Sequence, residues 1–268
     1  MGTPLLGDLS LGPVGLAIAA AMVATMLVLA ILSVRFQVLT ATASVTAAVL
    51  GIAFLVLGGI PYLAVMLFFV FEGAVVTRYR LSEKQAQKVG EGKQGERGVT
   101  NVLAHTVIPL ILVLPIALPG TDAFSDLVPF LFTAAISFGA ADTFASEIGV
   151  LAPGAVSILG FAPVKPGTNG GISLRGELAA LGATLLTAAF GFLAFWIAGS
   201  ALAAEGVLWL LGIALAGWLG CQVDSVVGAS AENRGWIGKS SVNLIGMAAT
   251  VGIAAGWLLL VPFLPGVN

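Results

Sequence analysis

Charged side chains are scarce in this sequence, and that scarcity excludes most classes of protein. Asp, Glu, Lys and Arg together make up 9% of its 268 residues, and the mean hydropathy is +1.08. An average soluble domain carries about 25% charged residues. A water-soluble enzyme or binding module is therefore excluded. With a net charge of −2, we also expect no nucleic-acid partner.

Cysteine and histidine are each present once. The single cysteine, Cys221, excludes a disulfide framework, and its place in an apolar run indicates a small core residue. The lack of a Cys/His cluster excludes zinc as the expected metal. His105 lies inside an expected helix, where we interpret it as a hydrogen-bonded residue of a helix interface. So few histidines also argue against a mechanism that depends on a histidine base.

Apolar runs long enough to span a bilayer, roughly 17 to 25 residues each, recur along the whole sequence. They are continuous and do not alternate with period two, which excludes a β-barrel. We predict an all-α, polytopic membrane protein that forms a single transmembrane domain over residues 1–268. Its eight expected helices cover about 12–31, 37–58, 61–77, 101–118, 127–146, 177–199, 206–229 and 241–263.

The basic residues indicate the orientation in the membrane. With the N-terminus outside, all 11 Lys and Arg residues lie in inner segments, as the positive-inside rule requires. We expect both termini outside and two cytoplasmic loops, a basic one at 78–100 and a glycine-rich one at 147–176. Residues 149–162 of the second loop are apolar but short and contain Pro153, which indicates a re-entrant or interfacial segment. The outer segments carry only acidic charges, at Asp8, Asp122, Asp126 and Glu205.

The start of the sequence bears on the location of the protein. No basic residue precedes the first apolar run, which is unlike a signal peptide, so we expect a retained first helix. An Arg- and Ser-rich transit peptide is also missing. These features favour a multi-pass protein of the cell membrane, with its functional site facing the cytoplasm.

Four acidic residues lie inside the expected helices or at their inner ends. Glu72 belongs to the third helix, Asp142 and Glu147 to the end of the fifth, and Asp224 to the seventh. A carboxylate at membrane depth costs a few kcal/mol and usually faces a wet cavity or a partner. Because oxygen ligands suit Mg²⁺, we predict a magnesium site formed by Asp142, Glu147 and Asp224. The alternative is that these carboxylates are solvated at the interface and paired with nearby basic residues.

Small residues accompany two of these carboxylates. Ser146 lies four residues after Asp142 and so shares a helix face with it. Ser225 directly follows Asp224, within the stretch DSVVGAS. Such small side chains leave room for a ligand to approach the backbone, and we expect both serines to support the site.

The stretch PVKPGTNGGISLRG at 163–176 is more specific than a connection between two helices requires. Its glycines allow successive backbone N–H groups to form an anion nest, and it runs into the positive N-terminal end of the next helix. Lys165 and Arg175 flank it, so we predict a phosphate site, although the spacing is not that of a Walker A loop. The alternative is a flexible turn with Ser173 capping the helix. The predicted nest consists of Gly167, Thr168, Asn169, Gly170 and Gly171.

The stretch RYRLSEKQAQKVGEGKQGERG at 78–98 is rich in cations. A solvated loop that follows the positive-inside rule accounts for most of them. Arg78 lies at the membrane edge, and Arg97 lies close to the next helix, which contains Asn101. We predict that these three residues bind the phosphate of a lipid headgroup.

Several motifs together resemble a known family of integral membrane proteins. They read FFVFEGAVVTRYR, GERGVTNVLAH, ADTFASEIG, PGTNGGISLRG and DSVVGAS followed by SVNLIG, over roughly residues 60 to 250. The family is that of transmembrane protein 19 and the chloroplast phytyl-phosphate kinase. More distantly, the motifs resemble dolichol kinase and the CTP-dependent lipid cytidylyltransferases. Gly98 and His105 depart from the family pattern, which has Asn at both places, and this bears on the identity of the lipid.

The resemblance implies an enzyme that acts on an isoprenoid lipid phosphate. We expect a Mg²⁺-dependent kinase that transfers a phosphoryl group from CTP or ATP to the lipid monophosphate and gives the diphosphate. Asp142, Ser146 and Glu147 match the family's acidic motif, the GTNGG loop matches its glycine loop, and Asp224 and Asn243 match its C-terminal motif. The expected catalytic residues are Asp142, Glu147, Asp224 and Lys165. The nucleotide would contact GTNGG, Ser173 and Arg175, and the expected supporting residues are Glu72, Ser146, Ser225 and Asn243.

Other functions stay open at this point. A polyprenol kinase would need Asp142 or Asp224 to take the proton of the alcohol, and a lipid cytidylyltransferase would release pyrophosphate. An ion-coupled transporter would carry its acidic residues near the midplane, whereas these lie towards one face. Membrane lipids surround the chain in every case, and a homo-oligomer is left open.

Overall fold

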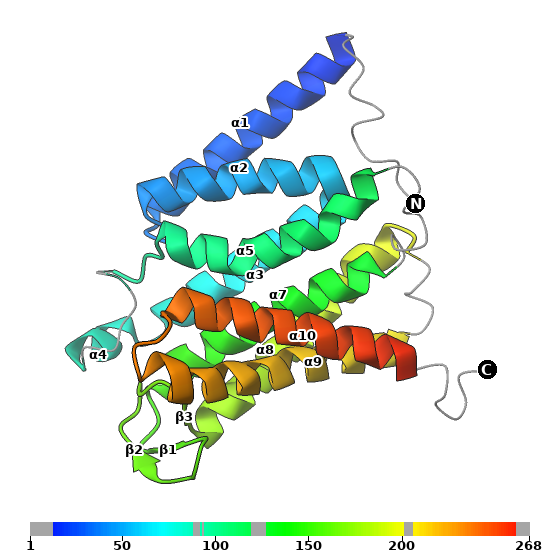
Figure 1. Ribbon diagram of the computed structural model, residues 1–268. Coiled ribbons are helices and arrows are strands. Elements are labelled where there is room, and N and C mark those ends of the chain that lie inside the picture. The colour runs from blue at the N-terminus through cyan, green and yellow to red at the C-terminus, as the bar shows by residue number, and fades with distance from the viewer. Residues whose placement is uncertain (1–12, 88–91, 93, 119–126, 201–205, 261–268) are drawn as a thin grey trace.

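Eight helices of the computed structural model are long and apolar enough to cross a membrane (Figure 1), which confirms the predicted multi-pass helical protein. The structure describes residues 13–87, 92, 94–118, 127–200 and 206–260. The long helices are α1 (Pro13–Arg35), α2 (Ala41–Gly58), α3 (Ile60–Arg78), α5 (Val99–Val113), α7 (Val128–Gly149), α8 (Leu174–Ile197), α9 (Gly206–Val227) and α10 (Lys239–Leu260). A 3-10 turn, η2 (Leu114–Ala117), extends α5, and a π-helical turn, η4 (Gly228–Glu232), extends α9. The short helix α4 (Leu81–Ala86) lies between α3 and α5.

Two helices begin where a side chain caps them and not where the apolar run suggests. Thr40 accepts a hydrogen bond from the backbone N–H of Ala43 at 3.3 Å, so α2 begins later than predicted. Ser173 accepts one from the backbone N–H of Gly176 at 3.1 Å, so α8 begins three residues before the predicted position 177. The capping role considered for Ser173 is thereby confirmed, since this contact satisfies a free donor of the first turn.

α7 is the central helix of the bundle. It packs on α8 and α9 along most of its length and also contacts α3, α5 and α10. Ser137 of α7 donates a hydrogen bond to the carbonyl of Ile213 in α9 at 3.2 Å. A Cβ atom on Gly217 would lie 2.2 Å from Ser137 Oγ, so only glycine permits this close approach. Near the N-terminal end of α7, the rings of Phe132 and Tyr62 meet edge to face, with centroids 4.9 Å apart. These contacts fix α7 and the polar residues at its other end.

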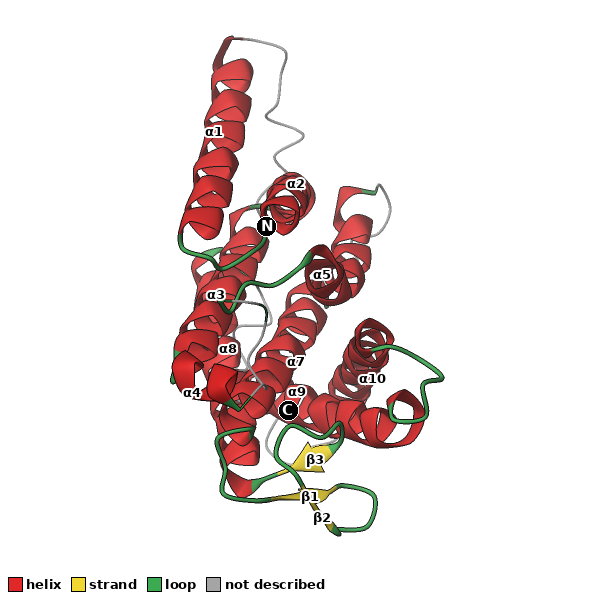
Figure 2. Cartoon of the chain, turned by 90° about the vertical axis from the view of Figure 1, so that its left-hand side faces the viewer, coloured by secondary structure: helices red, strands yellow, loops and turns green. Residues whose placement is uncertain are grey.

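The connection from α7 to α8 forms a small antiparallel sheet. Its strands are β1 (Ala155–Ser157), β2 (Pro163–Val164) and β3 (Gly171–Ile172), in the order β2-β1-β3. Ala155 pairs with Val164, and Val156 pairs with Ile172. Figure 2 shows the sheet beyond the helix ends, so residues 149–162 do not re-enter the bundle. Pro153 and Gly154 lie in the turn that precedes β1, where a helix cannot continue.

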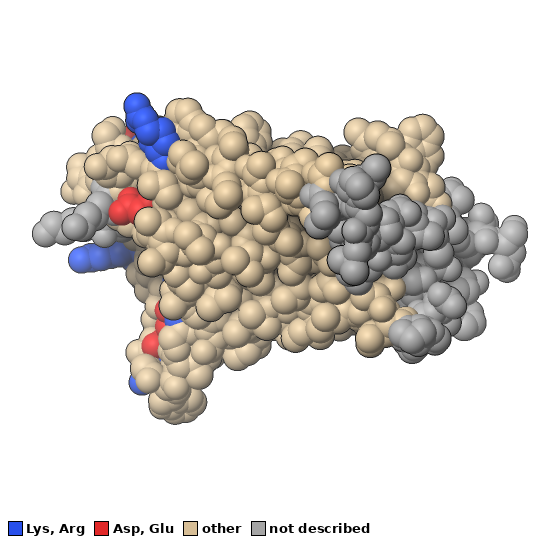
Figure 3. All heavy atoms as spheres, turned by 90° about the horizontal axis from the view of Figure 1, so that it is seen from above, with Lys and Arg blue, Asp and Glu red and all other residues tan. Residues whose placement is uncertain are grey.

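The charged side chains gather at one end of the bundle, which we call the charged end. It is the end at which α4 and the sheet lie, and blue and red atoms cluster there in Figure 3, while the middle of this face is tan. Arg35, Arg78 and Lys239 lie at helix termini of this end. The side of the membrane that this end faces stays a prediction. The acidic residues predicted outside, Asp8, Asp122, Asp126 and Glu205, lie outside the described residues.

Candidate functional site

A polar cavity of about 300 Å³ opens at the charged end, between α7, α8, α9 and the start of α10. The glycine-rich loop closes one side of it. The helices contribute Asp142, Ser146, Asp224, Ser225 and Asn243, all of which were predicted from the sequence. The whole predicted nest, Gly167 to Gly171, also lines the cavity. The structure thus brings the acidic motif, the glycine loop and the C-terminal motif to one place.

Two carboxylates from different helices line this polar cavity. Asp142 comes from α7 and Asp224 from α9, and their negative charges repel one another. Within the described residues, Oδ1 of Asp224 is buried and accepts no hydrogen bond. A buried carboxylate oxygen without a partner costs free energy unless a cation or donor satisfies it. The two aspartates therefore form an arrangement that suits a bound cation.

Lys239 is the cation of the polar cavity, and the sequence analysis missed it. It begins α10, lines the cavity and interacts electrostatically with Asp224 and with Glu232 of η4. Its signal in the sequence was its position directly before the SVNLIG motif. Another missed residue is Glu177 of α8, which lines the same cavity. Its Oε2 accepts hydrogen bonds from Trp218 Nε1 at 2.9 Å and from the side-chain amide of Gln222 at 2.8 Å.

The two cations predicted to flank a phosphate lie elsewhere. Lys165 is exposed and does not belong to the lining of the polar cavity. Arg175 is also exposed, and its Nη1 donates a hydrogen bond to the carbonyl of Leu151 at 3.1 Å. This contact fastens the turn after α7 to the start of α8. Neither residue lines the cavity, whereas Lys239 does, and the phosphate contacts of Lys165 and Arg175 stay a prediction.

The glycine loop is held against the end of α9. Gly167 and Gly170 have positive φ angles of 86° and 71°, conformations that favour glycine. Asn233, just after η4, donates a side-chain hydrogen bond to the carbonyl of Asn169 at 3.1 Å. No hydrogen bond within the described chain takes the backbone N–H of Asn169 or of Gly170. The backbone N–H groups of Thr168 and Gly171, by contrast, donate to the carbonyls of Lys165 and Thr168. The anion nest over the whole of 167–171 stays a prediction.

Replacing Gly170 by alanine should disrupt this loop. The new Cβ would lie 2.3 Å from the Cβ of Ala229 and 2.5 Å from the carbonyl oxygen of Ser225. Together with the positive φ, this clash should cost about 1–3 kcal/mol. If the loop binds the phosphates predicted from the sequence, Gly170→Ala should weaken nucleotide binding at least tenfold, measured by the thermal shift on addition of Mg²⁺ and nucleotide. Gly160→Ala is the matched control, because its Cβ would meet no atom within 4 Å. Equal behaviour of the two variants would contradict this account.

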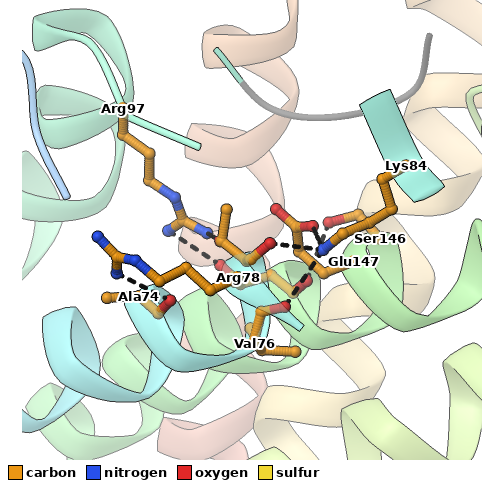
Figure 4. A network of polar contacts seen from close by, with 9 residues as sticks. Ala74, Val76, Arg78, Lys84, Arg97, Ser146 and Glu147 are labelled. Carbon is orange, nitrogen blue, oxygen red and sulfur yellow. Dashed lines mark hydrogen bonds and ion pairs between the residues drawn. The ribbon is translucent and has the colours of Figure 1, made fainter. Parts of the chain in front are cut away.

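Glu147 has a different partner from the one predicted. Lys84 of α4 is completely buried, and its Nζ lies 2.5 Å from Oε2 of Glu147. The same ammonium donates hydrogen bonds to the carbonyls of Val76 at 3.2 Å and Thr77 at 2.7 Å, at the end of α3. Figure 4 shows Lys84 reaching from α4 into this corner between α3 and α7.

The predicted magnesium site of three carboxylates stays a prediction. No group of three or more His, Cys, Asp or Glu residues in the described chain is arranged to hold a metal ion. Glu147 forms its ion pair with Lys84 and also lines the polar cavity. The basic loop is also less solvated than predicted, because α4 inserts a lysine into the bundle.

Arg97 and Arg78, both predicted to bind a lipid phosphate, have separate surroundings. The guanidinium of Arg97 donates to the hydroxyl oxygens of Thr77 at 3.2 Å and Thr143 at 3.3 Å. Arg78 is exposed and donates to the carbonyl of Ala74 at 3.2 Å (Figure 4). It also donates to the carbonyl of Phe36. Backbone carbonyls thus engage Arg78, whereas Arg97 lines a second cavity.

The second cavity is an apolar groove of about 400 Å³ between α1, α2, α3 and α5. Arg97, Asn101 and His105 are among its few polar lining residues. His105 is buried, and its Nδ1 lies 2.9 Å from the carbonyl oxygen of Asn101. Its Nε2 lies 3.5 Å from the side-chain nitrogen of Asn243, which belongs to the polar cavity. His105 is thus a helix-interface residue, as interpreted from the sequence, and it lies in the wall between the two cavities.

The half of α7 nearer the charged end forms the rest of this wall. Asp142 lines the polar cavity, and the next residue, Thr143, contacts Arg97 of the apolar groove. The two cavities therefore meet across a wall that is one helix thick and polar. Glu72, predicted as a supporting residue, lines neither cavity. It is buried, and its Oε1 accepts a hydrogen bond from Thr187 of α8 at 2.9 Å.

Comparison with known proteins places this architecture in a family. An uncharacterized membrane protein of Methanocaldococcus jannaschii is 31% identical over 87% of this chain and 90% of its own. An uncharacterized membrane protein of Synechocystis sp. is 31% identical, with 74% and 76% covered. The chloroplastic protein VTE6 of Arabidopsis thaliana is 32% identical over 71% of this chain and 56% of its own. No solved structure matches. The sequence model of the integral membrane protein family DUF92 matches residues 24–260, and the chain belongs to this family.

Proposed function

We propose that the protein is a membrane-embedded isoprenoid phosphate kinase. It transfers the terminal phosphoryl group of a nucleoside triphosphate, CTP or ATP, to an isoprenoid monophosphate and gives the diphosphate. One observation carries the proposal: a polar cavity with a glycine loop and an apolar groove with a cationic end meet across the inner part of α7. A water-soluble donor and a lipid acceptor need sites of these two kinds, side by side.

The polar cavity is the proposed donor site. The phosphates would lie on the GTNGG loop and the N-terminal end of α8, where backbone N–H groups and the helix dipole favour anions. Asp142 and Asp224 would hold Mg²⁺, which fits two carboxylates in the lining of one cavity and the Oδ1 of Asp224 that accepts no hydrogen bond. The ion would neutralise phosphate charge during transfer. Lys239 adds a protein cation at the same place and replaces Lys165 in the predicted role.

The acceptor phosphate would lie at Arg97 and Asn101, at the polar end of the groove. One of its oxygens forms a bond to the terminal phosphorus of the nucleotide, while the bond from that phosphorus to its bridging oxygen breaks and the nucleoside diphosphate leaves. The acceptor oxygen is already anionic at neutral pH, so no strong base is needed. Positioning and charge neutralisation then account for most of the catalysis.

The relatives support this class of reaction. The similarity to VTE6 is consistent with the resemblance to the phytyl-phosphate kinase family. The donor site would face the cytoplasm, where nucleotides are available, and this agrees with the basic residues at the charged end. In a cell membrane, both termini would then lie outside.

The test uses the purified protein in detergent with Mg²⁺ and γ-labelled CTP or ATP. Geranylgeranyl phosphate and geranylgeraniol are offered separately, and Asp142→Asn serves as the inactive control. We expect label in the diphosphate and none with the control variant. Label only in the product of the alcohol would show a polyprenol kinase. Release of pyrophosphate with a CDP-lipid would show a cytidylyltransferase, and no turnover with any lipid would favour the transporter.

A further inference from the structure

The shape and lining of the apolar groove also bear on which lipid it can bind. We propose that it holds the isoprenoid tail of the acceptor and that two positions on α2, Ala47 and Gly51, set the longest tail it accepts. This inference rests on the proposed function. The groove's volume of about 400 Å³ lies within the range of ligand sites. Its lining is almost entirely apolar, which suits a hydrocarbon chain.

The charge at one end of the groove identifies the head of its occupant. Thr77, Arg97 and Asn101 line the groove near the charged end. Arg97 is held by Thr77 and Thr143, so its guanidinium is fixed in place before any ligand binds. One fixed cation at the end of an apolar channel complements an apolar chain with a single anionic head. An isoprenoid monophosphate has this character.

The side of the groove is open to the surroundings of the bundle. Phe36, in the turn that follows α1, and Phe71 of α3 line it, and they are 62% and 65% exposed. In a membrane such residues face lipid, since the helices at this level are apolar. A tail can therefore enter sideways between α1 and α3 without leaving the hydrocarbon phase.

The far end of the groove is closed. A Cβ atom on Gly51 would lie 2.9 Å from Sδ of Met26 and 3.6 Å from Cδ1 of Leu63, and Phe54 behind it is only 1% exposed. All of these residues line the groove. From Ser44 near the charged end to Phe54, α2 rises about 15 Å. The space for a tail thus ends close to the middle of a hydrocarbon core about 30 Å thick.

Ala47 and Gly51 lie at two different depths along the groove. Both line the groove, and they lie one helical turn apart on the same face of α2. A leucine at 51 would fill the closed end, whereas a leucine at 47 would block the groove about 6 Å nearer to Arg97. Val49 of the same helix is 62% exposed and does not line the groove, so Val49→Leu is the matched control.

The test measures binding and transfer separately on the full-length protein in detergent. Geranyl, farnesyl and geranylgeranyl phosphate are compared by native mass spectrometry and by transfer of label from the nucleotide. We expect Gly51→Leu to weaken binding of the geranylgeranyl compound at least tenfold and to spare the shorter ones. Ala47→Leu should also exclude the farnesyl compound, and Val49→Leu should match the wild type.

Other results would overturn the proposal. One such result is that the wild type binds none of the three compounds. Another is that the leucine variants weaken the binding of all three compounds equally, or of none. The proposal would also be overturned if an excess of prenyl phosphate did not displace a bilayer phospholipid from the groove. If a leucine variant does not fold, Gly51→Ala replaces it, because the flexible end of Met26 can shift to admit one methyl group. If tails bind by length but receive no phosphoryl group, the kinase proposal fails and the assignment of the groove stands.

Discussion

Replacing Asp224 by asparagine is expected to abolish phosphoryl transfer and to make the protein without Mg²⁺ more stable. The loss of activity should be at least about a hundredfold, as for other residues that stabilise charge during a reaction. The gain in stability arises because burial of the carboxylate and its repulsion by Asp142 outweigh its attraction to Lys239, so a neutral amide at this place is favoured. Relief of about 1 kcal/mol would raise the melting temperature by about 2–4 °C in a protein of this size.

The opposite signs of these two effects separate a functional role from a structural one. Mg²⁺ with nucleotide should raise the melting temperature of the wild type and have little effect on Asp224→Asn, because only a ligand that binds the folded state stabilises it. Glu177→Gln is the control, since this carboxylate already accepts two hydrogen bonds and should lose stability when neutralised. An Asp224→Asn protein that is active and less stable would contradict the proposed cation site.

Replacing Lys84 by methionine should have the largest effect on stability. The substitution leaves Glu147 charged and buried without its partner, and it removes a donor from two carbonyls at the end of α3. Breaking such a pair costs about 3–5 kcal/mol, which corresponds to a fall in melting temperature on the order of 10 °C. Arg80→Met is the matched control, because Arg80 forms an exposed ion pair with Glu83 in the same short helix. An exposed pair contributes about 1 kcal/mol at most.

A second substitution in the same background tests the role of Glu147. We expect Lys84→Met combined with Glu147→Met to recover most of the lost stability, since both buried charges are then absent. If activity returns as well, Glu147 serves only as the partner of Lys84. A double variant that is stable but inactive would show that Glu147 contributes to the donor site. If Lys84→Met melts no lower than Arg80→Met, the ion pair does not hold α4 in place.

The sequence predicts the parts of this molecule that depend on long, local patterns. Eight apolar runs correspond to eight helices, and three motifs placed Asp142, Asp224 and the GTNGG loop in one polar cavity. The strands of two or three residues in the loop after α7 show no usable periodicity, so the sheet was missed. The burial of Lys84 and the electrostatic interaction of Lys239 with Asp224 depend on how separate segments approach each other. The local pattern of charged residues in the sequence does not predict which distant segments come together.

The packing of the first two helices has a consequence for how such proteins diversify. α1 packs mainly on α2, whereas α7 to α10 pack on one another. Substitutions that reshape the wall around Met26 and Gly51 therefore act on a part of the bundle that carries none of the residues lining the polar cavity. If the two proposed sites hold, preference for the lipid can change through the first helices while the proposed nucleotide site stays the same.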